Sequence, residues 1–143
     1  MTVLPYAVGG DDQWVFHQRK VGVFADAVLP VDASTFLLAL PVVDTDRLWL
    51  IERIVATSNA EAVELRLAVD PQRPAVRRAT EEPAAIVDFL PAPGRVAVVS
   101  RPAAIAVPEE HRLTVEWKGM SAAPGPSGYA VGIRADVVVL RRL

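Results

Sequence analysis

Twelve prolines and eight glycines are spread along this 143-residue chain, and they limit what it can fold into. A proline inside a helix removes a backbone hydrogen bond and clashes with the preceding turn, so helices rarely run through one. The pieces between these residues are short, and none predicts a long helix. We therefore expect a fold built from short strands, not from helices or from strands that alternate with helices.

The clearest pieces alternate between apolar and polar side chains, which is typical of strands with one buried face. Residues 48–58 and 61–70 are predicted to be two such strands, paired antiparallel through a short turn, although a short helix competes for the second. In the second strand the residues expected to share the buried face are Val63, Leu65, Leu67 and Val69. In residues 111–119 the buried set is Leu113, Val115 and Trp117.

The last run, residues 129–143, is apolar on both faces near its end. One face carries Val131, Ile133, Ala135, Val137 and Val139, and the other carries Arg134, Asp136, Val138 and Leu140. Such a run predicts a central strand or a strand that a partner covers. Val138 and Leu140 are therefore candidate interface residues.

Further short strands are predicted at residues 13–18, 21–29, 84–90, 95–100 and 103–107, and residues 33–40 are either a strand or one helical turn. Roughly eight to ten strands at this spacing predict an all-β fold, an antiparallel β-sandwich of jelly-roll type. One domain is expected at this length. Residues 1–45 form either an extended N-terminal arm or the first strands, and residues 46–143 form the body of the sandwich.

The composition of the chain excludes several classes of function. Hydrophobic residues make up 52% of the chain and charged residues 22%. This hydrophobic fraction is high for a small soluble monomer, and burial of apolar side chains between subunits would account for it. The formal charge of −2 gives no reason to expect nucleic acid. The absence of cysteine excludes disulfides and thiolate-ligated metals. No signal peptide or membrane segment is expected, because charges and prolines interrupt the most apolar stretch, residues 21–43.

No arrangement of residues predicts catalysis. The only histidines, His17 and His111, are not spaced as metal ligands, and we interpret them as strand-edge or strand-end residues. Asp44 and Asp46 start like a calcium loop but lack its glycine and distal glutamate. The sequence therefore predicts no enzyme activity, no metal and no cofactor.

Residues 69–83 are predicted to be an exposed loop. Its Arg73, Arg77 and Arg78 are candidate interface residues, because arginine is enriched in protein interfaces. A solvated loop is the favoured interpretation, because Glu81 and Glu82 balance these charges, and the interface is the alternative.

Residues 46–70 and 105–143 resemble small virion proteins of tailed bacteriophages. The resemblance rests on Trp49–Ile54, on Thr57–Ser58, on the segment Pro108–Ser121 and on the basic end Arg141–Arg142, and covers about the last two-thirds of the chain. These are strand patterns and not a chemical signature. The resemblance implies a β-sandwich capsid-decoration, head-fibre or tail-associated component.

The expected function is thus a non-enzymatic virion structural protein, assembled in the host cytoplasm. Its expected partners are the major capsid protein or tail proteins and further copies of itself, with a trimer favoured. The alternative is a carbohydrate- or receptor-binding module at a tail or fibre tip. That alternative predicts an exposed aromatic side chain among Trp14, Tyr6 and Tyr129, since Trp49 and Trp117 fall in buried positions.

Overall fold

The computed structural model describes residues 6–7, 13–29, 36–71, 85–121 and 128–143, which form strands and no helix. The strands are β1 (Tyr6–Ala7), β2 (Gln13–Leu29), β3 (Phe36–Ala39), β4 (Arg47–Ser58), β5 (Glu64–Pro71), β6 (Ala85–Pro91), β7 (Val96–Val107), β8 (His111–Lys118) and β9 (Tyr129–Arg142). In these ranges there is accordingly no helix long and apolar enough to cross a membrane. The predicted all-β class is confirmed.

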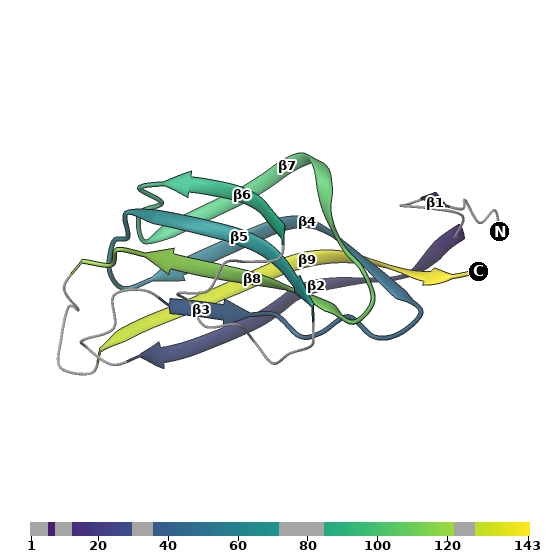
Figure 1. The fold of residues 1–143 in the computed structure, drawn as a ribbon, viewed down its shortest axis with the longest axis horizontal. Coiled ribbons are helices and arrows are strands. Elements are labelled where there is room, and N and C mark those ends of the chain that lie inside the picture. The colour runs from purple at the N-terminus through teal and green to yellow at the C-terminus, as the bar shows by residue number, and fades with distance from the viewer. Residues whose placement is uncertain (1–5, 8–12, 30–35, 72–84, 122–127) are drawn as a thin grey trace.

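The strands form two antiparallel sheets that pack face to face (Figure 1). The five-stranded sheet has the order β1-β2-β9-β4-β7, and the four-stranded sheet has the order β3-β8-β5-β6. The chain changes sheet at every connection except β1 to β2 and β5 to β6. This interleaving of two nested Greek keys is a jelly roll, so the predicted β-sandwich is confirmed in its topology as well.

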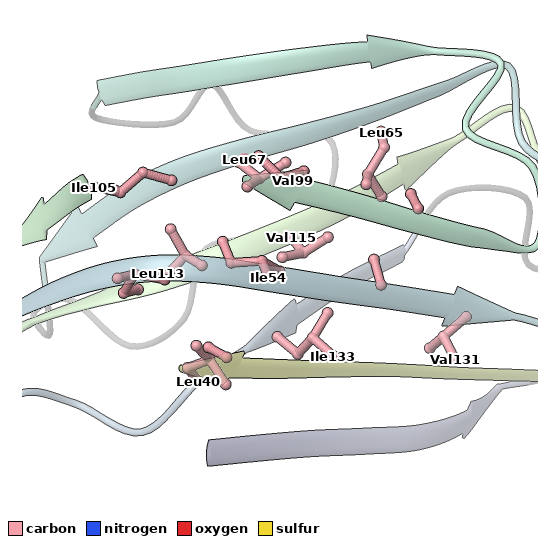
Figure 2. Packing of buried hydrophobic residues seen from close by; sticks show 14 of the residues in the cluster. Leu40, Ile54, Leu65, Leu67, Val99, Ile105, Leu113, Val115, Val131 and Ile133 are labelled. Atoms are coloured by element: carbon pink, nitrogen blue, oxygen red, sulfur yellow. The ribbon is translucent and has the colours of Figure 1, made fainter. Parts of the chain in front are cut away.

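The core lies between the two sheets and is built from the inward positions of each strand (Figure 2). All of the predicted inward residues of β9 belong to it, from Val131 to Val139, and so do Leu65, Leu67, Val115 and Trp117. Trp117 is 1% exposed, so the dry register predicted for β8 is confirmed. The period-two pattern thus located the residues between the sheets, although Thr114 and Glu116 on the other face of β8 are buried as well.

The predicted pairing of residues 48–58 with 61–70 is wrong. β4 pairs with β7 and β9, whereas β5 lies in the other sheet between β6 and β8. The intervening turn does not reverse into a hairpin, because its backbone bonds to the strands it passes: Asn59 N donates to Ala130 O, and Val63 N to Lys118 O. Val63 is accordingly 71% exposed and not part of the buried face as predicted.

Two pairs of predicted short strands are single long strands. Residues 13–18 and 21–29 both belong to β2, which continues past Gly22 because glycine adopts its φ of 71° without strain. Residues 96–100 and 103–107 both belong to β7, which continues through Pro102, and Arg95 precedes the strand. β7 is an edge strand, where a missing backbone donor breaks no ladder.

Both sheets take strands from either side of the division expected at residue 45. β2 and β3 precede it, and they pair with β9 and β8 respectively. Residues 1–5 and 8–12, on which the prediction of an extended arm also falls, lie outside the described residues.

Candidate interaction surface on the five-stranded sheet

The predicted interface residues of β9 are covered by the chain itself. Val138 and Leu140 face away from the main core and are 9% and 0% exposed, in a small cluster with Trp14 and Leu48. β9 pairs with β2 on one side and β4 on the other, which is the central-strand alternative. Whether these two residues also contact a partner stays a prediction. The predicted loop arginines, Arg73, Arg77 and Arg78, lie outside the described residues.

Two of the three aromatic side chains proposed for sugar binding are buried. Trp14 is 5% exposed and Tyr129 is 3% exposed, and the Tyr129 ring lies 5.0 Å from that of Phe36 between their centroids. The side chain of Tyr6 lies outside the described residues. Trp14 and Tyr129 are therefore not the exposed aromatic that the sugar-binding alternative predicts, because both pack into apolar clusters, and the prediction stays open at Tyr6.

The exposed apolar side chains gather instead on the outward face of the five-stranded sheet. Phe24, Val28, Val96 and Val98 are 60%, 72%, 63% and 49% exposed. The register places them together with the half-buried Val55: Phe24, Arg134, Val55 and Val98 lie opposite one another across β2, β9, β4 and β7. We call Phe24, Val28, Val55, Val96 and Val98 the outer patch.

The next row across the same strands is Asp26, Gly132, Thr57 and Val96. Strand spacing and rise give the two rows together with Val28 a footprint on the order of 300 Å². This footprint is mixed, since Asp26, Arg134 and Thr57 lie within it between the apolar side chains.

A shallow groove of about 470 Å³ runs along the outer patch and is lined by β2, β4 and β9. Gly132 forms part of its floor, because a Cβ there would approach Thr57 Oγ1 to 3.3 Å and Asp26 Cβ to 3.7 Å. The Arg134 guanidinium lies over the Phe24 ring, 5.8 Å from its centroid. Aromatic residues and arginine are enriched among the residues that contribute most to binding energy in protein interfaces.

Charged residues border the outer patch toward the middle of the sheet. Arg19 and Glu52 form an ion pair, and Asp136 accepts a hydrogen bond from Gly22 N at 3.2 Å. Asp26, Arg53 and Arg134 have no ion-pair partner among the described residues. A partner can therefore find both signs of charge beside the apolar groups.

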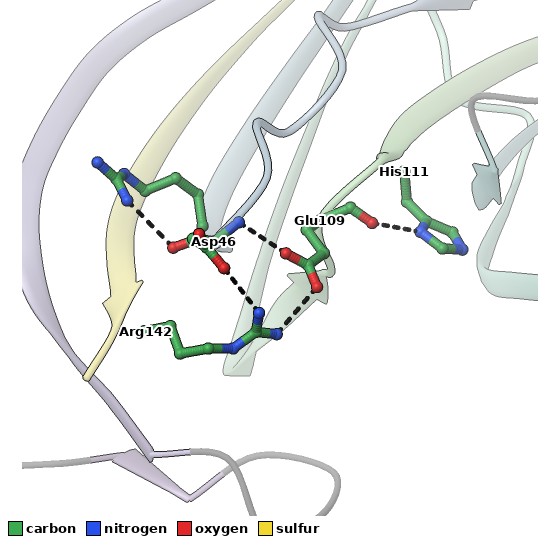
Figure 3. Close-up of polar contacts among 5 residues, drawn as sticks. Asp46, Glu109, His111 and Arg142 are labelled. Atoms are coloured by element: carbon green, nitrogen blue, oxygen red, sulfur yellow. Dashed lines mark hydrogen bonds and ion pairs between the residues drawn. The ribbon is translucent and has the colours of Figure 1, made fainter.

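A cluster of Asp46, Glu109 and Arg142 lies at the end of β9, in the five-stranded sheet (Figure 3). Arg142 Nη1 lies 2.7 Å from Asp46 Oδ1, and Nη2 lies 2.9 Å from Glu109 Oε1. Asp46 N donates to Glu109 Oε2 at 2.6 Å. This backbone donor and the Arg142 guanidinium lower the pKa of Glu109 below its ordinary value. The cluster ties the last strand to two turns, a structural role.

Asp46, one of the two aspartates that were compared with a calcium loop, belongs to this cluster. Asp46 has a φ of 62° and its carboxylate pairs with Arg142, so it stabilises a turn. His111 begins β8 with Nδ1 2.8 Å from Glu109 O, and His17 is exposed on the edge strand β2, both as interpreted from the sequence. Within the described residues, no three metal-ligating side chains come together.

The sequence held a signal for the outer patch that the strand predictions did not use. Val96 and Val98 alternate with Ala97 and Val99, so residues 96–99 are apolar on both faces, like the end of β9. For β9 the second face is covered, and for β7 it is exposed. Alternation alone does not distinguish these cases, because it depends on what lies beyond the sheet.

Comparisons of the chain with models of protein families, with curated proteins and with solved structures find no match.

Proposed function

We propose that this protein is a non-enzymatic structural component of a tailed-phage virion that acts through protein–protein contacts. The place best supported by the resemblance is capsid decoration or a minor capsid position, with the major capsid protein or tail proteins as partners. The observation that carries the proposal is the outer patch: Phe24, Val28, Val96 and Val98 expose large apolar area on the face of a rigid sheet. A surface of that kind favours contact with another protein over contact with water.

The topology supports the same proposal by analogy only. Jelly rolls occur in viral capsid proteins, but also in lectins and in other classes, so the fold narrows the function without deciding it. The carbohydrate-binding alternative predicts an exposed aromatic side chain, and two of its three candidates, Trp14 and Tyr129, are buried. Self-association is part of the proposal, and the expected trimer stays a prediction.

The test is the protein content of particles purified by density gradient from a host that carries this gene in a phage. We expect mass spectrometry to find the chain in intact particles at a fixed ratio to the major capsid protein. Its absence from such particles, with the soluble protein present in the same lysate, would contradict the proposal.

A paired substitution tests the outer patch within that experiment. Phe24→Ser should reduce incorporation into particles at least about tenfold, as loss of an apolar contact centre predicts. Phe89→Ser is the matched control, because Phe89 is 47% exposed and also lies under an arginine, but on the other sheet. Equal incorporation of the two variants would exclude the outer patch as the docking surface.

A further inference from the structure

The free edge of β2 is the longest open strand edge beside the outer patch. β9 pairs with β2 along one side, from Trp14 to Leu29. On the other side β1 pairs only with Gln13 and Trp14, and no described strand lines the rest (Figure 1). An open edge presents backbone N–H and C=O groups that can pair with a further strand.

The two halves of this edge differ. The first half is irregular, with register shifts between Phe16 and Gln18 and between Lys20 and Val23, and it carries Arg19 and Lys20. Bulges and basic side chains are the devices by which proteins prevent edge pairing. The second half, Val23–Leu29, pairs with β9 without a shift and contains one charge, Asp26. Among the described residues, neither a bulge nor a lysine or arginine protects the half beside the outer patch.

Both faces of this half are suited to an added strand. Val23, Ala25 and Ala27 point inward and are only partly buried against the core. Phe24 and Val28 point outward and are exposed. A strand added at the edge would cover more of both sets, which adds apolar burial to the backbone hydrogen bonds.

The register of such a pairing follows from the charges if the added strand is β2 of a second copy. An antiparallel two-fold pairing keeps outward residues opposite outward residues only when its centre falls on a residue. A centre at Asp26 places two aspartates opposite each other, which is unfavourable. A centre at Phe24 places Asp26 at the Gly22 bulge.

Centres at Ala25 and at Ala27 both avoid these conflicts, and the centre at Ala25 is the one that brings opposite charges toward each other. Asp26 of one copy then lies opposite Phe24 of the other, whose ring carries the Arg134 guanidinium at 5.8 Å. The pairing therefore places each Asp26 two strands away from an Arg134, whose guanidinium lies over the Phe24 ring between them, and the symmetry repeats this arrangement. Neither charge has an ion-pair partner among the described residues of its own chain.

We propose that the protein forms a two-fold dimer in which residues 23–27 of β2 pair antiparallel about Ala25, joining two five-stranded sheets into one. This deepens the proposed function by naming the partner for self-association, and it rests on that function only for its biological setting. A two-fold contact predicts even-numbered assemblies, in contrast to the trimer expected from the sequence.

Charge reversal tests the contact in solution. The mass by sedimentation equilibrium should be twice 15.4 kDa for the unaltered chain. Asp26→Arg and Arg134→Asp should each raise the dimer dissociation constant about tenfold or more, and the double variant should restore it, because like charges are then replaced by opposite ones. Circular dichroism verifies that each variant is folded. A monomer at all concentrations, or a dimer that neither single variant weakens, would overturn the proposal.

A single cysteine tests the register, since the chain has none of its own. Ala25→Cys should give a disulfide-linked dimer on mild oxidation, because residue 25 faces its own copy across the axis. Ala27→Cys should not, because it would lie opposite Val23 and about 13 Å from its counterpart at 3.3 Å per residue, beyond disulfide reach. Cross-linking of Ala27→Cys but not Ala25→Cys would overturn the register.

The two proposals fail separately. A trimer in solution would overturn the two-fold contact and leave the virion role intact. A dimer that cross-links through residue 25 but is absent from phage particles would support the contact and contradict the virion role.

Discussion

The outward faces of the two sheets contrast in a way that polarity alone does not predict. On the four-stranded sheet, Thr114 and Glu116 are 0% exposed and Asp70 is 5% exposed, although all three are polar. On the five-stranded sheet, Phe24 and Val28 are apolar and exposed.

The contacts of the buried polar groups explain one side of this contrast. Thr114 Oγ1 donates to Asp70 Oδ2 at 2.6 Å, and Arg66 Nη1 lies 3.8 Å from Glu116 Oε2. Buried polar groups persist where the fold supplies partners. We infer that the four-stranded sheet uses its outward face to hold the fold, whereas the five-stranded sheet presents its outward face to another molecule.

The largest effect on this contrast should come from Arg66→Ala. It would remove the Arg66 guanidinium from the buried Glu116 carboxylate, which also lies 3.9 Å from Lys118 Nζ. Loss of one partner of a buried ion pair predicts destabilisation of about 3 kcal/mol, measured as the free energy of unfolding in urea. Glu64→Ala removes a half-exposed partner of the same arginine and should cost under about 0.5 kcal/mol. Similar costs for both would show that the Glu116 pair is not a buried ion pair in energetic terms.

Thr114→Val should have the next largest effect. It keeps the shape of the side chain but removes the donor to the buried Asp70 carboxylate, at a cost of about 1 to 2 kcal/mol. Thr57→Val is the control on the other sheet, since Thr57 is exposed and its bond to Gly132 O is 3.4 Å long. We expect that control to change the unfolding free energy by under about 0.5 kcal/mol. A larger cost at Thr57 would reverse the contrast between the two faces.

Glu109 forms a part-exposed ion pair with Arg142, and its contribution to the free energy of unfolding should depend on pH. Because its pKa is lower in the folded chain than in the unfolded chain, Glu109 stabilises the fold above the unfolded pKa. That contribution is lost as pH falls through the folded pKa, so Glu109→Gln should flatten the loss of stability between about pH 5 and 3. Thermal melts across this range measure it, with Glu110→Gln as the control. The same loss of stability at low pH in Glu109→Gln as in the unaltered chain would contradict the pairing with Arg142.

The smallest effect on stability should come from the outer patch. Phe24→Ser and Phe89→Ser each remove a side chain that is about half exposed, so we expect the unfolding free energy of the monomer to change by under about 1 kcal/mol. Only Phe24→Ser should weaken self-association, read as the dimer dissociation constant. A large loss of monomer stability in Phe24→Ser would mean that Phe24 serves the fold rather than contact.

The sequence predicted the strands and their buried faces well, because the alternation of β8 and β9 reports one buried face directly. It did not predict which strands pair, since β4 and β5 are adjacent in the chain but belong to different sheets. The deciding contacts, such as Asn59 N to Ala130 O, join residues far apart in the chain.

The interface was harder to predict for a related reason. Val138 with Leu140 and Val96 with Val98 give the same outward apolar signal, yet the first pair is buried and the second is exposed. Which one is covered depends on neighbours outside the strand, here Trp14 and Leu48 for the β9 pair. Local pattern therefore predicts the fold class better than the surface that acts.

The central claim is that the second half of β2, Val23–Leu29, is a contact surface. Hydrogen exchange at several protein concentrations tests this claim most directly. The account predicts that amides within residues 23–27 become more protected as concentration rises, while those of residues 96–100, on the opposite edge of the sheet, do not. The amides of Asp26→Arg should show no such dependence. Protection that rises in residues 96–100 instead, or nowhere in the five-stranded sheet, would contradict it.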